Sequence, residues 1–216
     1  MTWVLTMAAP GEWRTVMVGE DRDAQVSAAV EEVFRRADRD SSAAQKHWMR
    51  QRLERALDGA DDAGGRVVSV AFPTALVAGV VLPVTATVLG LEVESDSMES
   101  AMKALAAVAA ADPTAKPMST PAGLALRTHR TTDVKEAFDA EVAEAPVSPD
   151  ERDAIRAASS TMPMLRARYL VPTSGERRWH AVAFSATLGT EEPGLVENFL
   201  ELFDAFAETL EWRQDQ

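Results

Sequence analysis

A histidine and a serine stand five residues apart in the stretch W-H-A-V-A-F-S-A-T, Trp179 to Thr187, and these are the residue types of a nucleophile and its general base. Successive side chains of a strand point to opposite faces. Because the separation of His180 and Ser185 is odd, a regular strand keeps them too far apart for proton transfer. We therefore expect no catalytic dyad here, and His180 to be a partly exposed edge residue.

Basic side chains alternate along two other expected strands. Arg127 and His129 share one face of the first strand, and Arg166 and Arg168 share one face of the second. If these strands are neighbours, the two rows form a positive patch suited to a carboxylate- or phosphate-bearing partner. The alternative is cross-strand pairing of the same side chains with the surplus carboxylates. The candidate binding patch is Arg127, His129, Arg166 and Arg168.

The sequence lacks the residues or motifs that several common kinds of active or binding site require. The chain has no cysteine, which excludes disulfides, thiolate metal sites and cysteine nucleophiles. Its 3 histidines, at positions 47, 129 and 180, are far apart in the sequence, so a metal site requires assembly by folding. Neither a glycine-rich phosphate loop nor a G-x-S-x-G serine motif occurs. We expect no catalytic residue, no metal and no cofactor.

The charge balance restricts the partners. A formal net charge of −12 repels nucleic acid and anionic membrane surfaces, so we expect neither as a partner. Arginine outnumbers lysine and alanine is abundant, which indicates GC-rich codon usage and a bacterial source. The N-terminal stretch M-T-W-V-L-T-M-A-A-P lacks the positive region of a secretory signal, so the expected location is the cytoplasm.

One segment, Val67 to Leu91, has 25 residues and no charge, which is long enough for a membrane span. Valine and threonine supply eleven of these positions, and two prolines and two glycines interrupt them. This composition favours strands, and Ala78-Gly79 offers a turn between two valine-rich halves. The segment therefore predicts a buried β-hairpin, with a membrane span as the alternative.

The other elements follow from periodicity and turn residues. Strands are expected at Thr2–Met7 and Trp13–Val18, pairing as a hairpin, and at Gly123–Val134. A second hairpin is expected from Met164–Pro172 and Arg177–Leu188. Helices are expected as a helical hairpin over residues 21 to 64, at Met98–Ala110, from a Ser148 cap to Ala158, and from Pro193 to the C-terminal region. Loops are expected at Asp112–Pro121 and Glu136–Pro149.

Hairpin-type links between consecutive strands predict an α+β fold: a single domain, residues 1–216, with an antiparallel β-sheet covered by helices. The C-terminal helix carries a wide apolar stripe, with Phe199, Phe203 and Phe206 among its members. We expect this stripe to cover the sheet face that bears Val182 and Phe184.

A pattern in the C-terminal half resembles uncharacterised proteins of high-GC Gram-positive bacteria. A strand hairpin ending in F-S-A, Phe184 to Ala186, precedes a helix with F-D-A-F, Phe203 to Phe206, and then Trp212. This ending is also similar to that of PsbP-like α/β/α domains, and P-G-E-W at Pro10 to Trp13 suits the same plan. The resemblance implies an α/β/α sandwich whose members bind other proteins, and it implies no catalytic residue.

The leading functional hypothesis from the sequence is a non-enzymatic protein-interaction or accessory protein with a protein partner. The alternative is a small-molecule-binding protein or hydrolase that uses the basic patch on the sheet.

Overall fold

The computed structural model describes residues 3–8, 13–19, 21–35, 43–59, 65–74, 84–92, 97–157, 160–173, 178–188 and 194–214. The strands are β1 (Trp3–Thr6), β2 (Trp13–Met17), β3 (Gly65–Pro73), β4 (Val84–Glu92), β5 (Lys116–Thr120), β6 (Gly123–Asp133), β7 (Pro163–Pro172), β8 (Arg178–Thr187) and β9 (Glu211–Gln214). The helices are α1 (Arg22–Val33), α2 (Ala43–Gly59), α3 (Met98–Ala111), α4 (Lys135–Glu144), α5 (Pro149–Ala157) and α6 (Leu195–Ala207).

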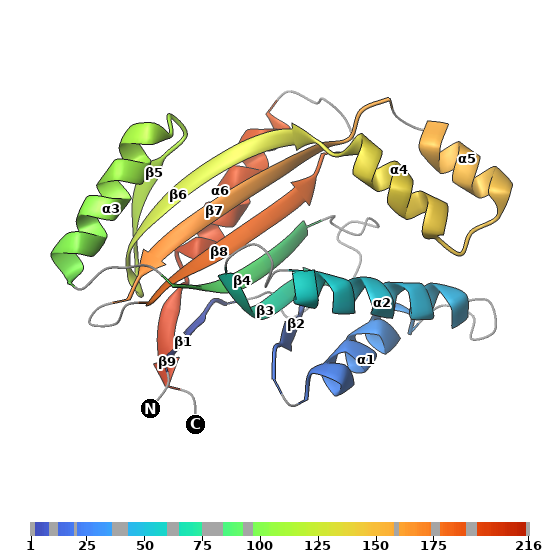
Figure 1. Cartoon of the computed structure of the whole chain (residues 1–216), viewed down its shortest axis with the longest axis horizontal. Coiled ribbons are helices and arrows are strands. Elements are labelled where there is room, and N and C mark those ends of the chain that lie inside the picture. The colour runs from blue at the N-terminus through green and yellow to red at the C-terminus, as the bar shows by residue number, and fades with distance from the viewer. Residues whose placement is uncertain are drawn as a thin grey trace.

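A seven-stranded sheet with the order β2-β3-β4-β8-β7-β6-β5 is the centre of the molecule, and every neighbouring pair is antiparallel (Figure 1). Helices pack on both faces of it, so the expected α+β fold is confirmed. The expected β7–β8 hairpin is confirmed as an antiparallel pair, and its turn, residues 174–177, lies outside the described residues.

Helix α6 covers one face of the sheet through aromatic packing. The ring of Phe184 on β8 stacks on Phe203 at 4.8 Å between centroids and lies 6.0 Å from Phe206. The edge of Trp13 from β2 meets the same Phe206 ring at 5.3 Å. The apolar stripe of α6 therefore buries the face that the sequence predicts for it.

The opposite face is covered at its two ends. Helices α1 and α2 pack on β2 and β3 through a cluster that includes Val26, Leu57 and Phe72. Helix α3 packs on the β6–β7–β8 end through Leu105, against Leu170 and Trp179 among others. The stretch of sheet between α2 and α3 carries the site described below.

The expected hairpin of β1 and β2 is wrong. Strand β1 pairs with β9, so that the two chain ends lie side by side (Figure 1), and β2 pairs with β3. Leu5 and Leu210, buried in the same core cluster as Phe203, hold this terminal ribbon against the domain. Helix α6 ends at Ala207, and the buried Leu210 beyond it directly precedes β9.

Two segments expected to be loops form regular elements. Within Asp112–Pro121, residues 116–120 make β5, an edge strand that pairs with β6, and an edge position tolerates proline such as Pro117. Within Glu136–Pro149, the first nine residues all belong to α4, which buries Val142. The sequence did not predict this helix, because the segment is acidic and its apolar face is narrow.

The uncharged segment Val67–Leu91 supplies β3 and β4, which pair antiparallel as predicted. Its expected turn at Ala78-Gly79 lies outside the described residues. Among the residues that the structure describes, none of the helices has the length and apolar character needed to cross a membrane. The Ser148 cap is also confirmed, since Glu151 accepts a hydrogen bond of 2.9 Å from the Ser148 backbone N–H.

We expect Phe203→Ala to lower the free energy of unfolding by about 3–5 kcal/mol, because it removes a fully buried ring at the centre of the α6 face. Phe199→Ala on the same helix is the matched control, because Phe199 is only partly buried, and we expect it to cost less than half as much. Urea unfolding measures both. Equal losses would contradict the packing described for α6.

Candidate functional site

A hollow of about 680 Å³ lies on the sheet face opposite α6, with side chains of β4, β6, β7 and β8 around it. Ala56 of α2 lies at one margin, and Asp112, just after α3, lies at another. The sheet is therefore open to a ligand in the stretch that α2 and α3 leave between them.

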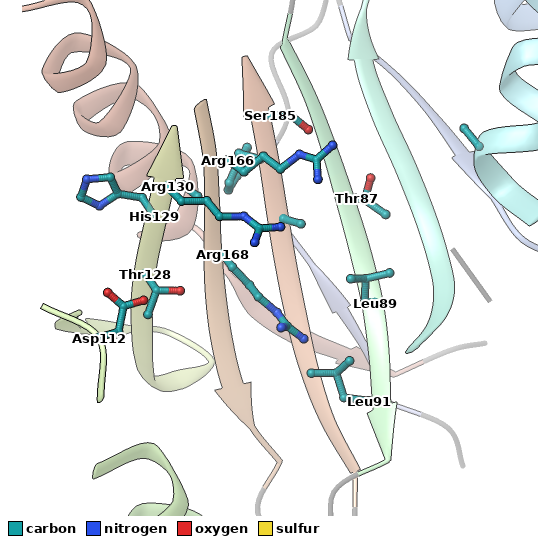
Figure 2. A pocket seen from close by; sticks show the side chains of 14 residues that line it. Thr87, Leu89, Leu91, Asp112, Thr128, His129, Arg130, Arg166, Arg168 and Ser185 are labelled. Atoms are coloured by element: carbon teal, nitrogen blue, oxygen red, sulfur yellow. The ribbon is translucent and has the colours of Figure 1, made fainter. Parts of the chain in front are cut away.

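Small side chains on β8 create the depth of this hollow. Ala183 lies between Arg168 of β7 and Thr87 of β4, and Ser185 lies between Arg166 and Thr85. The long arginine side chains therefore extend over a low floor. Figure 2 shows them reaching from their strands across β8 toward β4.

Arg130, Arg166 and Arg168, hereafter the arginine cluster, supply the charge of the site. Arg130 of β6 stands directly opposite Arg166 of β7, and Arg168 follows two residues along β7. All three are exposed. Within the described part of the chain, no carboxylate pairs with any of them. Like charges directly opposite on neighbouring strands destabilise a sheet, so this arrangement carries a cost in the free protein.

Other arginines show the contrast, since the chain holds 34 acidic residues against 22 basic ones. Arg14 pairs with Glu32 at 3.1 Å, and Arg55 pairs with Glu144 at 3.3 Å. Asp112 lines the hollow, but its carboxylate accepts hydrogen bonds from the backbone N–H and the hydroxyl of Thr114, at 2.8 and 2.7 Å. These bonds lower the pKa of Asp112 and occupy its Oδ1 atom.

The arginine cluster remains cationic at neutral pH. Partial burial in the hollow lowers the pKa of Arg168 from its usual value, but a guanidinium does not lose its proton in proteins. Hydroxyl groups of Thr87, Thr128 and Ser185 also line the hollow, and Ser185 Oγ shares a hydrogen bond of 3.2 Å with Thr85 Oγ1. The hollow therefore presents fixed positive charge beside hydroxyl donors, which is the chemistry of an anion site.

The structure divides the patch predicted from the sequence. The register places Arg127 opposite Tyr169 and His129 opposite Ala167, on the face covered by α6, whereas Arg166 and Arg168 lie on the open face. The four side chains therefore do not converge. Arg130 takes the place of Arg127 beside β7. Alternation along β6 predicts the face on which Arg130 lies, but it does not predict the register that places Arg130 opposite Arg166.

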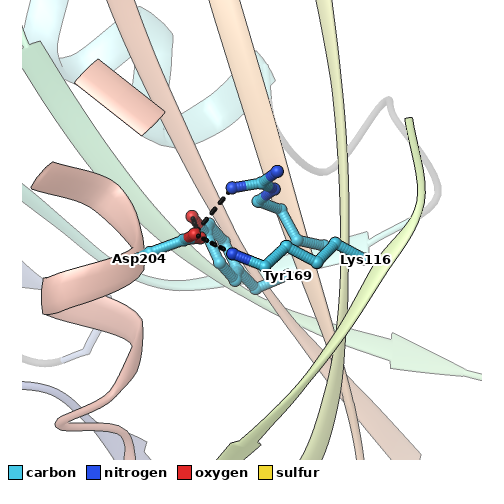
Figure 3. A network of polar contacts seen from close by, with 4 residues as sticks. Lys116, Tyr169 and Asp204 are labelled. Atoms are coloured by element: carbon cyan, nitrogen blue, oxygen red, sulfur yellow. Dashed lines mark hydrogen bonds and ion pairs between the residues drawn. The ribbon is translucent and has the colours of Figure 1, made fainter. Parts of the chain in front are cut away.

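Arg127 belongs to a polar network around Asp204 of α6, and Figure 3 shows this network with Lys116, Tyr169 and Asp204 labelled. Asp204 Oδ2 accepts hydrogen bonds from Arg127 Nη1 at 2.7 Å and from Lys116 Nζ at 3.0 Å. Asp204 Oδ1 accepts one from Tyr169 Oη at 2.8 Å. One carboxylate on α6 therefore ties the helix to β5, β6 and β7, which indicates a structural role.

Burial contributes to the pKa shifts of Asp204 and Tyr169 in this network and of His129 beside it. Burial alone raises the pKa of Asp204, but the hydrogen bonds from Tyr169, Lys116 and Arg127 outweigh it and hold that pKa below its usual value. Burial, together with the bond to Asp204, raises the pKa of the Tyr169 phenol. Burial and the charge of Arg127 lower the pKa of His129. His129 is therefore neutral at pH 7.

His180 and Ser185 lie on opposite faces of β8, as strand alternation predicts. The His180 ring packs edge-on against Trp212 at 4.9 Å on the α6 side, and Ser185 lines the hollow. They form no dyad. In the described ranges of the chain, no group of three or more histidine, aspartate or glutamate side chains has an arrangement that could hold a metal ion.

Comparison with known proteins gives no match: none of the protein-family models, curated proteins or solved structures searched is similar to this chain.

We expect Asp204→Asn to lower the free energy of unfolding at pH 7 by about 3 kcal/mol, because it leaves the buried Arg127 charge without its partner. The folded-state pKa of Asp204 lies below the unfolded value near 3.9. Its contribution is thus complete above that value and is lost as the pH falls through the folded pKa. The difference between wild type and variant should therefore shrink in acid.

Urea unfolding between pH 7 and pH 2.5 measures this difference. Tyr169→Phe is the control, because it removes a neutral donor and should cost about 1 kcal/mol. A loss for Asp204→Asn that is the same at every pH would contradict the account of this network.

Proposed function

We propose that this protein is a non-catalytic binding protein that holds an anionic ligand on the arginine cluster. The observation that carries the proposal is the set of three guanidinium groups without carboxylate partners among the described residues, in one hollow of an acidic chain. The hollow, at about 680 Å³, is within the usual size range of ligand sites.

The energetics of the cluster support binding. Arg130 and Arg166 repel each other across the β6–β7 pair, and an anion between them replaces this repulsion with charge-assisted hydrogen bonds. The planar guanidinium matches the geometry of carboxylate and phosphate oxygens, which favours these two classes of ligand. The cytoplasm, the expected location, contains small anions of both classes.

The side chains around the hollow support binding over hydrolysis. The hydroxyls of Thr85 and Ser185 are hydrogen-bonded to each other. His129, the only histidine among the described lining residues, points away from the arginine cluster on the other side of β6 (Figure 2). No described lining residue is thus placed as a base beside Ser185.

A protein-interaction role is the second candidate function. Met98 and Met102, one turn apart on α3, are 43% and 38% exposed, and neighbouring exposed apolar side chains favour contact with another protein. This surface is separate from the arginine cluster, so the two functions are compatible.

We expect Arg166→Gln to raise the free energy of unfolding in low salt by roughly 0.2–1 kcal/mol, because it relieves repulsion with Arg130. Arg14→Gln changes the net charge equally but removes an ion pair with Glu32, so it should give no gain. Urea unfolding at 10 mM and 500 mM salt measures both, and the gain should shrink at high salt. A loss of stability for Arg166→Gln would show that its charge is paired in the free protein.

We expect inorganic pyrophosphate to bind the wild type, and the triple variant Arg130→Gln, Arg166→Gln, Arg168→Gln to bind it at least about tenfold more weakly, because charge-assisted hydrogen bonds are lost. Isothermal titration calorimetry measures both dissociation constants. The matched control is Arg14→Gln, Arg35→Gln, Arg213→Gln, which has the same net charge but leaves the hollow intact. Equal weakening by both triple variants would contradict the proposal.

A further inference from the structure

The hollow has two chemically different parts along the strand direction. Toward one end lie the rows that contain Arg166 and Arg168. Toward the other end, the next two rows bring Leu89 and Leu91 of β4 into its lining. Both leucines are only partly buried. Figure 2 shows them beyond Thr87 along β4, on the side toward which Arg168 extends.

The size of the hollow exceeds the needs of a simple anion. A water molecule occupies about 30 Å³ of liquid, and a phosphate group is as large as a few waters. The hollow of about 680 Å³ therefore has room for an anionic group together with a larger body. The distance along the strands between the row of Arg166 and the row of Leu91 is six residues on both β4 and β8. At the usual rise of a strand, six residues span about 20 Å.

We infer that the ligand is an amphiphilic anion, with a phosphate or carboxylate group on the arginine cluster and an apolar chain along Leu89 and Leu91. This inference rests on the proposed function and deepens it. The cationic rows fix the head group, and the leucines shield the chain from water. Neither part alone accounts for a hollow that joins the two.

A free amphiphile fits this site better than one embedded in a membrane. The net charge of −12 repels an anionic bilayer surface. The leucines also lie on the sheet, between α2 and α3, and are not at the tip of a protruding element. A single molecule in solution meets neither obstacle.

Calorimetric titration of the whole chain with inorganic phosphate and with butyl, hexyl and octyl phosphate, each below its micelle concentration, tests the inference. We expect the dissociation constant to fall roughly two- to fourfold for each added methylene that the hollow covers. Leu89→Thr with Leu91→Thr should abolish most of the gain from chain length, measured as the ratio of octyl phosphate affinity to phosphate affinity within the same variant. Leu124→Thr, an exposed leucine of β6 outside the lining, should behave as wild type.

The outcomes separate the two proposals. Phosphate and alkyl phosphate binding that is unaffected in the triple glutamine variant would overturn the proposed function itself. Two other outcomes would overturn only the inference that the ligand is amphiphilic. One is phosphate binding that requires the arginines but does not tighten with alkyl chain length. The other is a gain from chain length that persists in the leucine double variant. Sedimentation of the protein with vesicles of phosphatidylcholine and phosphatidic acid, lost in the triple variant, would overturn the assignment to a free amphiphile.

Discussion

The register between β6 and β7 is the constraint on which the site depends. It places Arg130 beside Arg166 on the open face, and Arg127 beside Tyr169 under α6. A shift of one residue would exchange the faces of every side chain on β6 relative to its neighbours. In the observed register, Arg127 lies on the side of the sheet where the carboxylate of Asp204 pairs with it. The arginine cluster lies on the side where none of the described carboxylates pairs with it.

The two basic groups illustrate how the surroundings decide the role of an arginine. Arg127 is almost completely buried, and Asp204 neutralises it, so its charge serves to hold α6 on the sheet. The arginine cluster keeps its access to water and its mutual repulsion. Because folded proteins have small net stabilities, a cluster of repelling charges is a substantial cost to folding. Its presence is consistent with a benefit to ligand binding that offsets this cost. Relief of that repulsion by an anion couples ligand binding to stability.

Much of the fold was predictable because strong local patterns coincide with the final elements. The alternation along Gly123–Val134, the capping box at Ser148 and the apolar stripe of the C-terminal helix each specify a local structure that the tertiary fold preserves. The partners of β1 were not predictable, because its pairing with β9 joins the two ends of the chain and depends on burial of Leu5. Strand β5 and helix α4 were missed because proline and acidic residues outweighed short apolar patterns.

The sequence predicted that the candidate site is a basic patch on the sheet, but it did not predict which basic residues form it. Alternation assigns each arginine to a face of its own strand, and it correctly groups Arg166 with Arg168. Alternation within one strand does not reveal which face of β6 matches which face of β7. That match is set by the core, where Ala125 and Tyr169 are buried together under α6.

The most direct test of the central claim is the NMR signal of each arginine side-chain Nε–H during titration with pyrophosphate. The structure predicts that Arg130, Arg166 and Arg168 shift together with one dissociation constant, while the buried Arg127 signal stays in place. A shift at Arg127 that matches the others, or no concerted shift within the arginine cluster, would contradict it.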